Sequence, residues 1–80
     1  MRTPRDKSWQ EVVRALSRFG YQVVRQTGSH VRLTTQQKGE DHVTVPAHNP
    51  VRVGTLNAIV GHVARHFGKT LPEMMDELFG

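Results

Sequence analysis

The order of patterns along these 80 residues predicts an α+β fold, in which a helix is followed by three antiparallel strands and a second helix. Apolar residues recur at helical spacing over residues 9–19 and 55–67, and a glycine follows each run. Between the two runs, three short segments rich in β-branched residues are separated by turn residues, a pattern typical of an antiparallel meander. A short helix is expected to follow at the C-terminus.

The first helix is predicted from its start signal and from its apolar face. Ser8 and Glu11 have the spacing of a capping box, in which each side chain bonds to the other residue's backbone N–H. Gly20 ends the helix because glycine adopts the left-handed conformation at little cost. The apolar face comprises Trp9, Val12, Val13, Leu16 and Phe19.

Three strands are predicted at residues 21–26, 30–35 and 42–46, and Pro46 ends the last one because it lacks an N–H. Strand alternation divides their side chains between two faces. The core face is expected to carry Val31, Leu33, Val43 and Val45. The opposite, polar face is expected to carry His30, Arg32, Thr34, His42 and Thr44. Tyr21 is a candidate for an exposed position, but one tyrosine is not a stacking platform for single-stranded nucleic acid.

The second and third helices are expected to have their own start signals. Thr55 can cap the second helix, which Gly68 ends. Thr70 and Glu73 repeat the capping-box spacing, with proline in the first turn of the helix they begin. We therefore expect a single domain over residues 1–80, with a core at 8–67 and a helical extension at 70–79.

Composition narrows the class of protein. The chain has no cysteine, which fits a reducing compartment. Its basic N-terminal segment leads into no apolar run, so we expect neither a signal peptide nor a membrane span. The expected location is therefore the cytoplasm. The net charge of +4 is uneven, since residues 1–39 carry eight basic and two acidic side chains and residues 40–80 carry three and five. A basic half on a small domain favours a nucleic acid or an acidic protein as partner.

One predicted turn brings a titratable group, two cations and a flexible backbone together. His30 follows the Gly28-Ser29 turn, and Arg25 and Arg32 flank it. RNA carries its own nucleophile, the 2′-hydroxyl, so its cleavage needs a group that moves protons and a cation that stabilises charge on phosphorus. Histidine can move protons at neutral pH, arginine grips phosphate oxygens, and the turn residues can approach and orient the phosphate. These residues favour RNA cleavage with neither a metal nor another cofactor.

Other groupings of reactive residues are weaker candidates. His62 and His66 have a spacing that can bind a metal, but no carboxylate accompanies them in their helix, so a structural role is favoured. A metal site built from His30, His42 and His48 would receive no acidic ligand from the strands. Serine hydrolase chemistry needs an aspartate–histidine pair, which the sequence pattern does not place.

Three motifs occur in the order and at the spacing of a known family. They are Gly20-Tyr21 followed by Arg25-Gln26-Thr27-Gly28-Ser29-His30, then Val43-Thr44-Val45-Pro46-Ala47-His48, then Gly54-Thr55-Leu56. Over about residues 9–67 the chain resembles the HicA toxin family. The family pattern is a Gly-aromatic pair, an Arg-Gln-x-Gly-Ser-His turn, a Thr-Val-Pro-x-His strand end and a Gly-Thr-Leu helix start.

The resemblance implies a fold similar to a double-stranded RNA-binding domain. It also implies a ribosome-independent mRNA endonuclease, an mRNA interferase, neutralised by a HicB antitoxin that covers the essential histidine. That histidine maps onto His30, and Gly28 and Ser29 match the turn that positions it. His48 matches a second recurrent histidine of the family and is interpreted as an accessory acid or base. The partners implied are mRNA and a HicB-like antitoxin.

Two positions depart from the family pattern and keep other functions open. The family usually has a basic residue where this chain has Thr27, and lysines in the loop where this chain offers only Arg52. Fewer phosphate contacts are therefore expected. One rival function is a non-catalytic RNA-binding module on the same fold, and another is a protein-interaction domain whose basic face meets an acidic partner.

Overall fold

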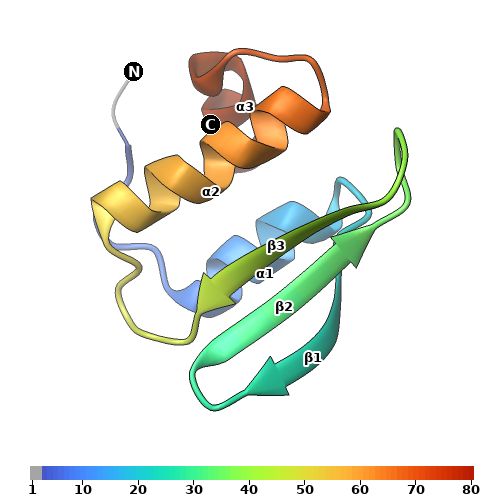
Figure 1. Ribbon diagram of the computed structural model, residues 1–80. Helices are drawn as coiled ribbons and strands as arrows, with labels where there is room; N and C mark the ends of the chain where they lie inside the picture. The colour runs from blue at the N-terminus through green and yellow to red at the C-terminus, as the bar shows by residue number, and fades with distance from the viewer. Residues whose placement is uncertain (1–2) are drawn as a thin grey trace.

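Six elements follow one another in the order that the sequence predicts (Figure 1). The structure is a computed structural model that describes residues 3–80. Its elements are α1 (Trp9–Ser17), β1 (Gln22–Thr27), β2 (His30–Thr35), β3 (Asp41–Pro46), α2 (Val53–His66) and α3 (Leu71–Phe79). The predicted α+β class, with its C-terminal helix, is confirmed. No helix in this part of the chain combines the length and the apolar character needed to cross a membrane.

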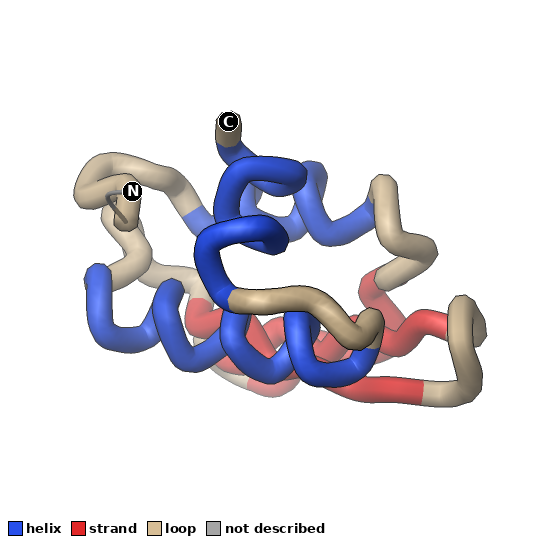
Figure 2. The backbone as a smooth tube through the Cα atoms, turned by 90° about the horizontal axis from the view of Figure 1, so that it is seen from above, coloured by secondary structure: helices blue, strands red, loops and turns tan. Residues whose placement is uncertain are grey.

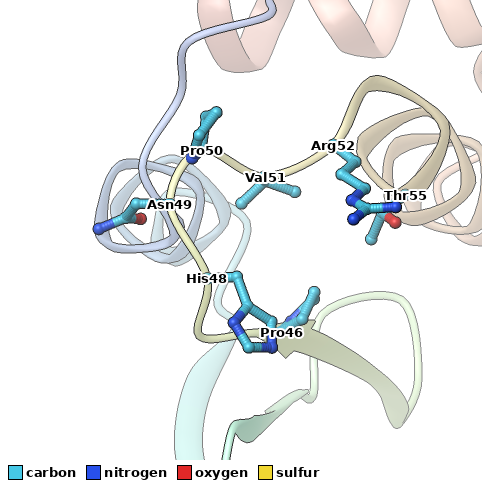
Figure 3. Close-up of a pocket in the computed structure, with 7 residues that line it drawn as sticks. All are labelled: Pro46, His48, Asn49, Pro50, Val51, Arg52 and Thr55. Atoms are coloured by element: carbon cyan, nitrogen blue, oxygen red, sulfur yellow. The ribbon is translucent and has the colours of Figure 1, made fainter.

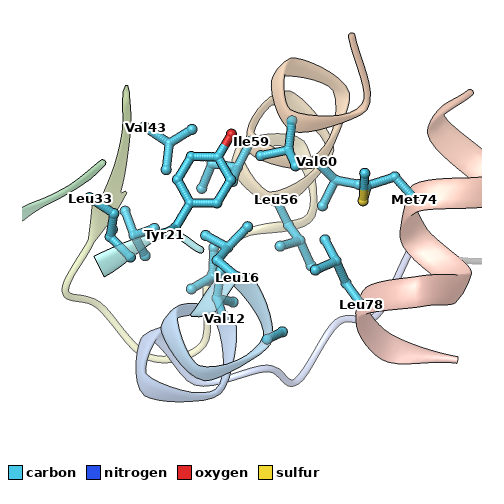
Figure 4. Packing of buried hydrophobic residues seen from close by; sticks show 14 of the residues in the cluster. Val12, Leu16, Tyr21, Leu33, Val43, Leu56, Ile59, Val60, Met74 and Leu78 are labelled. Carbon is cyan, nitrogen blue, oxygen red and sulfur yellow. The ribbon is translucent and has the colours of Figure 1, made fainter. Parts of the chain in front are cut away.

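The three strands form one antiparallel sheet in the order β1-β2-β3, and the helices cover one of its faces. Figures 1 and 2 show α2 between α3 and the sheet, and α2 contacts both β3 and α3. The four strand residues predicted to face the helices do so, and all are buried: Val31, Leu33, Val43 and Val45. They pack against the apolar stripes of the helices in a single cluster (Figure 4).

A β-bulge in β1 decides which residues of that strand face away from the helices. Gln22 and Val23 pair with Thr34 and Leu33, but the register then shifts so that Arg25 lies opposite Arg32. In an unshifted register Arg25 would oppose Val31 and point toward the helices. A single extra residue reverses the side of every residue beyond it. The bulge therefore places the Arg25 side chain on the open face of the sheet.

The starts of α1 and α3 confirm the predicted capping boxes. The Ser8 hydroxyl accepts the backbone N–H of Glu11, whose carboxylate accepts the N–H of Ser8. Thr70 and Glu73 repeat the arrangement, with Pro72 in the first turn. Each box satisfies backbone donors that have no partner within the helix.

The predicted cap of α2 is wrong. The helix begins at Val53 with Arg52 as its N-cap, and none of the described side chains caps it. The reason is that the backbone N–H of Leu56 already bonds to the Arg52 carbonyl at 2.8 Å, so Thr55 lies inside the first turn. The predicted end is correct, because Gly68 follows the helix with a φ of +68°.

The C-terminal helix is part of the same hydrophobic cluster as the sheet. Met74, Met75 and Leu78 are buried in it. The Arg18 guanidinium, beyond the end of α1, donates to the backbone carbonyls of Glu77 and Leu78. These carbonyls lie in the last turn of α3 and have no helical partner, so a basic side chain stabilises them. Arg18 thus belongs to the scaffold of the fold.

Tyr21, Asp41 and His62 form a polar cluster between the sheet and α2. The Tyr21 side chain is fully buried, which excludes an exposed position, and its hydroxyl donates to Asp41 at 2.6 Å. His62 Nε2 lies 2.9 Å from both carboxylate oxygens of Asp41. Asp41 begins β3, one residue before the predicted start of that strand. The aspartate–histidine pair that the sequence pattern does not place is therefore present, in a structural setting.

The cluster changes the pKa of both acidic groups. Burial alone would raise the pKa of Asp41. The hydrogen bonds from Tyr21 and His62, with the charges of His62 and His66, outweigh it and hold that pKa below its usual range. Burial raises the pKa of Tyr21, and the hydrogen bond and the negative charge of Asp41 raise it further. The folded state therefore favours an ionised Asp41 beside a protonated Tyr21.

Asp41→Asn should lower the free energy of unfolding at pH 7 by about 1 kcal/mol, because asparagine keeps the shape but loses the charge. Since the folded pKa of Asp41 is lowered, its stabilisation is present above the unfolded value of about 4 and is lost as pH falls through the folded value. Urea unfolding at pH 7 and pH 3 should show the difference narrowing at acid pH. The control Asp76→Asn, on the exposed face of α3, should change stability by less than about 0.5 kcal/mol. Equal stability of Asp41→Asn and wild type at pH 7 would contradict this role.

Candidate active site

A two-residue turn joins β1 to β2 and positions the candidate site. Thr27 pairs with His30, and Gly28 and Ser29 make the turn. Gly28 has a φ of +57°, and Ser29 is not among the residues with positive φ. This combination fits a type II′ turn, whose first central position favours glycine. The Ser29 carbonyl accepts the N–H of Ala47 at 2.6 Å, which ties the turn to the loop that follows β3.

His30 is exposed on the open face, at the first position of β2. It has Thr27 on one side and Pro46 on the other as its paired residues. Within residues 3–80 no group hydrogen-bonds to the imidazole, so both ring nitrogens are available to a ligand. The sheet thus holds the backbone of His30 in place from two sides and leaves its ring free.

Arg25 and Arg32 face each other directly across β1 and β2. Like charges in this position repel and destabilise a sheet. Neither guanidinium has a carboxylate within ion-pairing distance among the described residues. Both line a shallow hollow of about 270 Å³, together with Thr27, His30 and Thr44. The structure therefore brings His30 together with the two predicted arginines, in a setting that an anion would stabilise.

His48 lies in a second, larger cavity. This cavity, of about 640 Å³, is formed by the loop after β3 and the start of α2 (Figure 3). It is lined by Pro46, His48, Asn49, Pro50, Val51, Arg52 and Thr55. His48 is not among the residues that line the hollow of His30. Pro46 connects the two, since it pairs with His30 and lines the larger cavity.

His42 lies at the other end of β3 from Pro46 and has partners of its own. Its Nδ1 lies 2.7 Å from the Thr34 hydroxyl, and its Nε2 lies 3.0 Å from a Glu40 carboxylate oxygen. His30 pairs with Pro46, and His42 pairs with Thr34, four positions further along β2. The described residues contain no group of three histidine, cysteine or acidic side chains placed to hold a metal ion.

Sequence reasoning missed the Asp41–His62 pair, although a signal for it was present. Asp41 alternates with Val43 and Val45, so an extension of the strand by one residue places it on the helix-facing side. There it meets His62 of α2. Its position opposite Thr35, at the far end of the strands from His30, separates this pair from the candidate site.

The fold and the site define a small α+β protein whose open sheet face presents a histidine beside an opposed pair of arginines, and none of the three side chains has a hydrogen-bond or ion-pair partner among residues 3–80. The family described as the HicA toxin of bacterial toxin–antitoxin systems matches residues 9–69. The chain belongs to this family and is the toxin of a toxin–antitoxin pair, which implies an antitoxin partner. No curated protein and no solved structure matches closely enough to add to this assignment.

Gly28→Ala should lower the free energy of unfolding by about 1 kcal/mol, because alanine is strained at positive φ even though the space around Gly28 is open. The matched control is Gly54→Ala, in the first turn of α2, where the space is also open and φ is not positive. That change should be neutral or stabilising by up to about 0.5 kcal/mol. Thermal melting separates the two, at about 4–8 °C per kcal/mol for a domain of this size. Equal melting temperatures for the two variants would contradict the assigned turn.

Proposed function

We propose that this toxin is an mRNA interferase, an endoribonuclease that cleaves mRNA with His30 as its acid–base group and without a metal ion. The observation that supports this most is the opposed pair Arg25 and Arg32 beside the free ring of His30. A surface that serves only stability would gain from a carboxylate between the arginines or from the loss of one charge. A phosphate group would remove the repulsion and bring its diester within reach of the histidine.

The chemistry follows from what each side chain can supply. The 2′-hydroxyl of the RNA attacks the adjacent phosphorus, and the bond from phosphorus to the 5′-oxygen breaks. His30 accepts the proton of the 2′-hydroxyl and can return it to the leaving 5′-oxygen. Arg25 and Arg32 offset the negative charge that develops on the phosphoryl oxygens. The products are a 2′,3′-cyclic phosphate and a 5′-hydroxyl.

The remaining predicted residues have supporting roles in this proposal. Gly28 gives the turn its shape, and Ser29 holds the turn against the loop after β3 through its carbonyl, so the two position His30. The Ser29 hydroxyl can add a phosphate contact. The place of His48, in the adjoining cavity, fits a contact with bound RNA better than a second proton transfer at the same phosphate.

The antitoxin partner is proposed to be a HicB-like protein that covers the open face. A covering partner must offset the charges of Arg25 and Arg32, so an acidic contact surface is expected on it. Such a partner would exclude RNA by occupying the hollow of His30. Action on mRNA also places the proposed activity in the cytoplasm.

A non-catalytic RNA-binding module is the second candidate, and one observation favours it. Among the described residues that line the hollow, His30 is the only conventional acid or base at neutral pH. An RNA-binding module needs the arginines and has no need of the histidine, so substitution of His30 distinguishes the two functions.

His30→Ala should reduce the single-turnover rate of RNA cleavage at least about a hundredfold, because a positioned acid–base group contributes roughly 10²–10⁴-fold. The exposed ring fills no part of the core, so stability should change by less than about 1 kcal/mol. RNA binding and antitoxin binding should persist. Cleavage of a labelled RNA, thermal melting and filter binding measure the three quantities.

Two controls sharpen the result. His42→Ala removes a histidine from the same face but outside the hollow, and it should cleave at the wild-type rate. Val43→Ala truncates a buried residue, so stability should fall first and activity only as a consequence. If a His30→Ala protein melts normally and still cuts RNA at the wild-type rate, the catalytic proposal is wrong and the RNA-binding module takes its place.

A further inference from the structure

The larger cavity beside the candidate site has the composition of a binding pocket for a planar ring. Pro46, Pro50 and Val51 supply apolar walls, and none of the seven lining residues is acidic. Its volume of about 640 Å³ is ample for a nucleotide, since small-molecule sites are typically about 300–1,000 Å³. In Figure 3 the His48 ring and the Arg52 guanidinium approach the cavity from different stretches of the loop.

Three hydrogen bonds to two distant parts of the chain, the β1–β2 turn and the start of α1, hold this loop in place. The N–H of Ala47 donates to Ser29, and the N–H of Val51 donates to the carbonyl of Lys7 at 2.9 Å. The side-chain oxygen of Asn49 accepts the N–H of Trp9, at the start of α1, at 2.8 Å. Val51 itself is only 1% exposed. The cavity is therefore formed before any ligand arrives, which reduces the entropic cost of binding.

The polar groups of the cavity are free to meet a ligand. Among residues 3–80, neither the His48 ring nor the Arg52 guanidinium has a hydrogen-bond or ion-pair partner. Imidazole and guanidinium are both planar groups on which nucleobases stack. Arginine also binds phosphate, and the Thr55 hydroxyl lines the same cavity. Apolar walls with planar cationic and imidazole groups suit a nucleobase that carries a phosphate.

The cavity lies next to the place where the scissile phosphate is proposed to bind. His30 pairs with Pro46, and the Cα atoms of paired residues are about 4.5–5.5 Å apart. Pro46 also lines the cavity. An RNA strand whose phosphate contacts Arg25 and Arg32 can therefore continue past Pro46 and place its next base in the cavity.

We propose that this cavity is a nucleobase subsite, which binds the base next to the cleaved phosphodiester between Pro46, His48 and Arg52. The inference rests on the proposed function, because it takes single-stranded RNA as the ligand. His48 contacts the base here and is a specificity-determining residue. The subsite gives the toxin a preference for the nucleotide beside the cut, since a formed cavity accepts bases of different size and edge unequally.

The test is binding of small probes to the full chain, observed by NMR. Isotope-labelled protein is titrated with AMP, GMP, CMP and UMP, and with ribose 5-phosphate as the probe without a base. At least one nucleotide should shift the backbone amides of Val51, Arg52 and Thr55 more strongly than ribose 5-phosphate does, with an affinity that depends on the base.

Matched variants separate the contributions of base and phosphate. His48→Ala should weaken the preferred nucleotide about tenfold while ribose 5-phosphate is unaffected, because stacking on the base is lost. Arg52→Ala should weaken the nucleotides and ribose 5-phosphate alike. His42→Ala and Arg65→Ala, an exposed arginine near the other end of α2, should leave every probe unchanged.

Two outcomes would overturn the subsite. One is equal shifts for the nucleotides and ribose 5-phosphate, which would mean a phosphate site only, and the other is no response of these amides to any nucleotide. The measurement is independent of catalysis. If His30→Ala cuts RNA normally while the amides still report a base-dependent affinity, the proposed mechanism fails and the subsite stands. If no nucleotide shifts these amides while the His30→Ala protein fails to cleave RNA, the subsite is wrong and the proposed mechanism stands.

Discussion

The register shift in β1 is the constraint on which the candidate site depends. One extra residue, Val24, turns Arg25 from the helix-facing side to the open face, where it lies opposite Arg32. The repulsion between the two guanidinium groups destabilises the sheet locally. The sheet tolerates this repulsion because buried valine and leucine side chains on its other face pack against the helices. The hydrophobic core thus stabilises a charge arrangement that the open face alone would not keep.

The two ends of the paired strands β2 and β3 have different roles: one end stabilises the fold and the other positions the candidate site. At one end of the paired strands β2 and β3, the Tyr21–Asp41–His62 cluster fixes α2 against the start of β3. At the other end, the turn at Gly28 and the loop after β3 hold His30 beside Pro46. Because these features do not share side chains, substitution of the exposed His30 should affect chemistry with little effect on stability, whereas a change that strains the turn at Gly28 should lower stability as well.

Most of the fold follows from local patterns in the sequence. The two capping boxes and the alternation in β2 and β3 are signals within a few residues of one another, and the structure agrees with them. The sequence predicts a cap at Thr55 because threonine is a good cap by type, but the loop before α2 is fixed by contacts with Lys7 and Trp9, far away in the chain. No local pattern contains that information.

Part of the candidate site likewise follows from local patterns in the sequence, and part depends on tertiary contacts. The turn motif predicts that His30 and its flanking arginines lie near one another, and the structure brings them into one hollow. The bulge that makes this so is not readable from Val23-Val24-Arg25, because either valine fits either face of an edge strand and both are exposed, at 48% and 60%. The cavity at His48 depends on a loop shape set by tertiary hydrogen bonds, so it could be found only in the structure.

The identity of the ends left by RNA cleavage tests the central proposal most directly. The protein is incubated in chelator with an RNA cut at one site, and with the same RNA carrying a 2′-deoxy sugar at that site. Attack by the 2′-hydroxyl, assisted by His30, predicts a 2′,3′-cyclic phosphate from the first RNA and no cut at the altered position in the second. Products that end in a 3′-hydroxyl, or undiminished cleavage at the 2′-deoxy position, would contradict it, since both require a nucleophile other than the RNA itself.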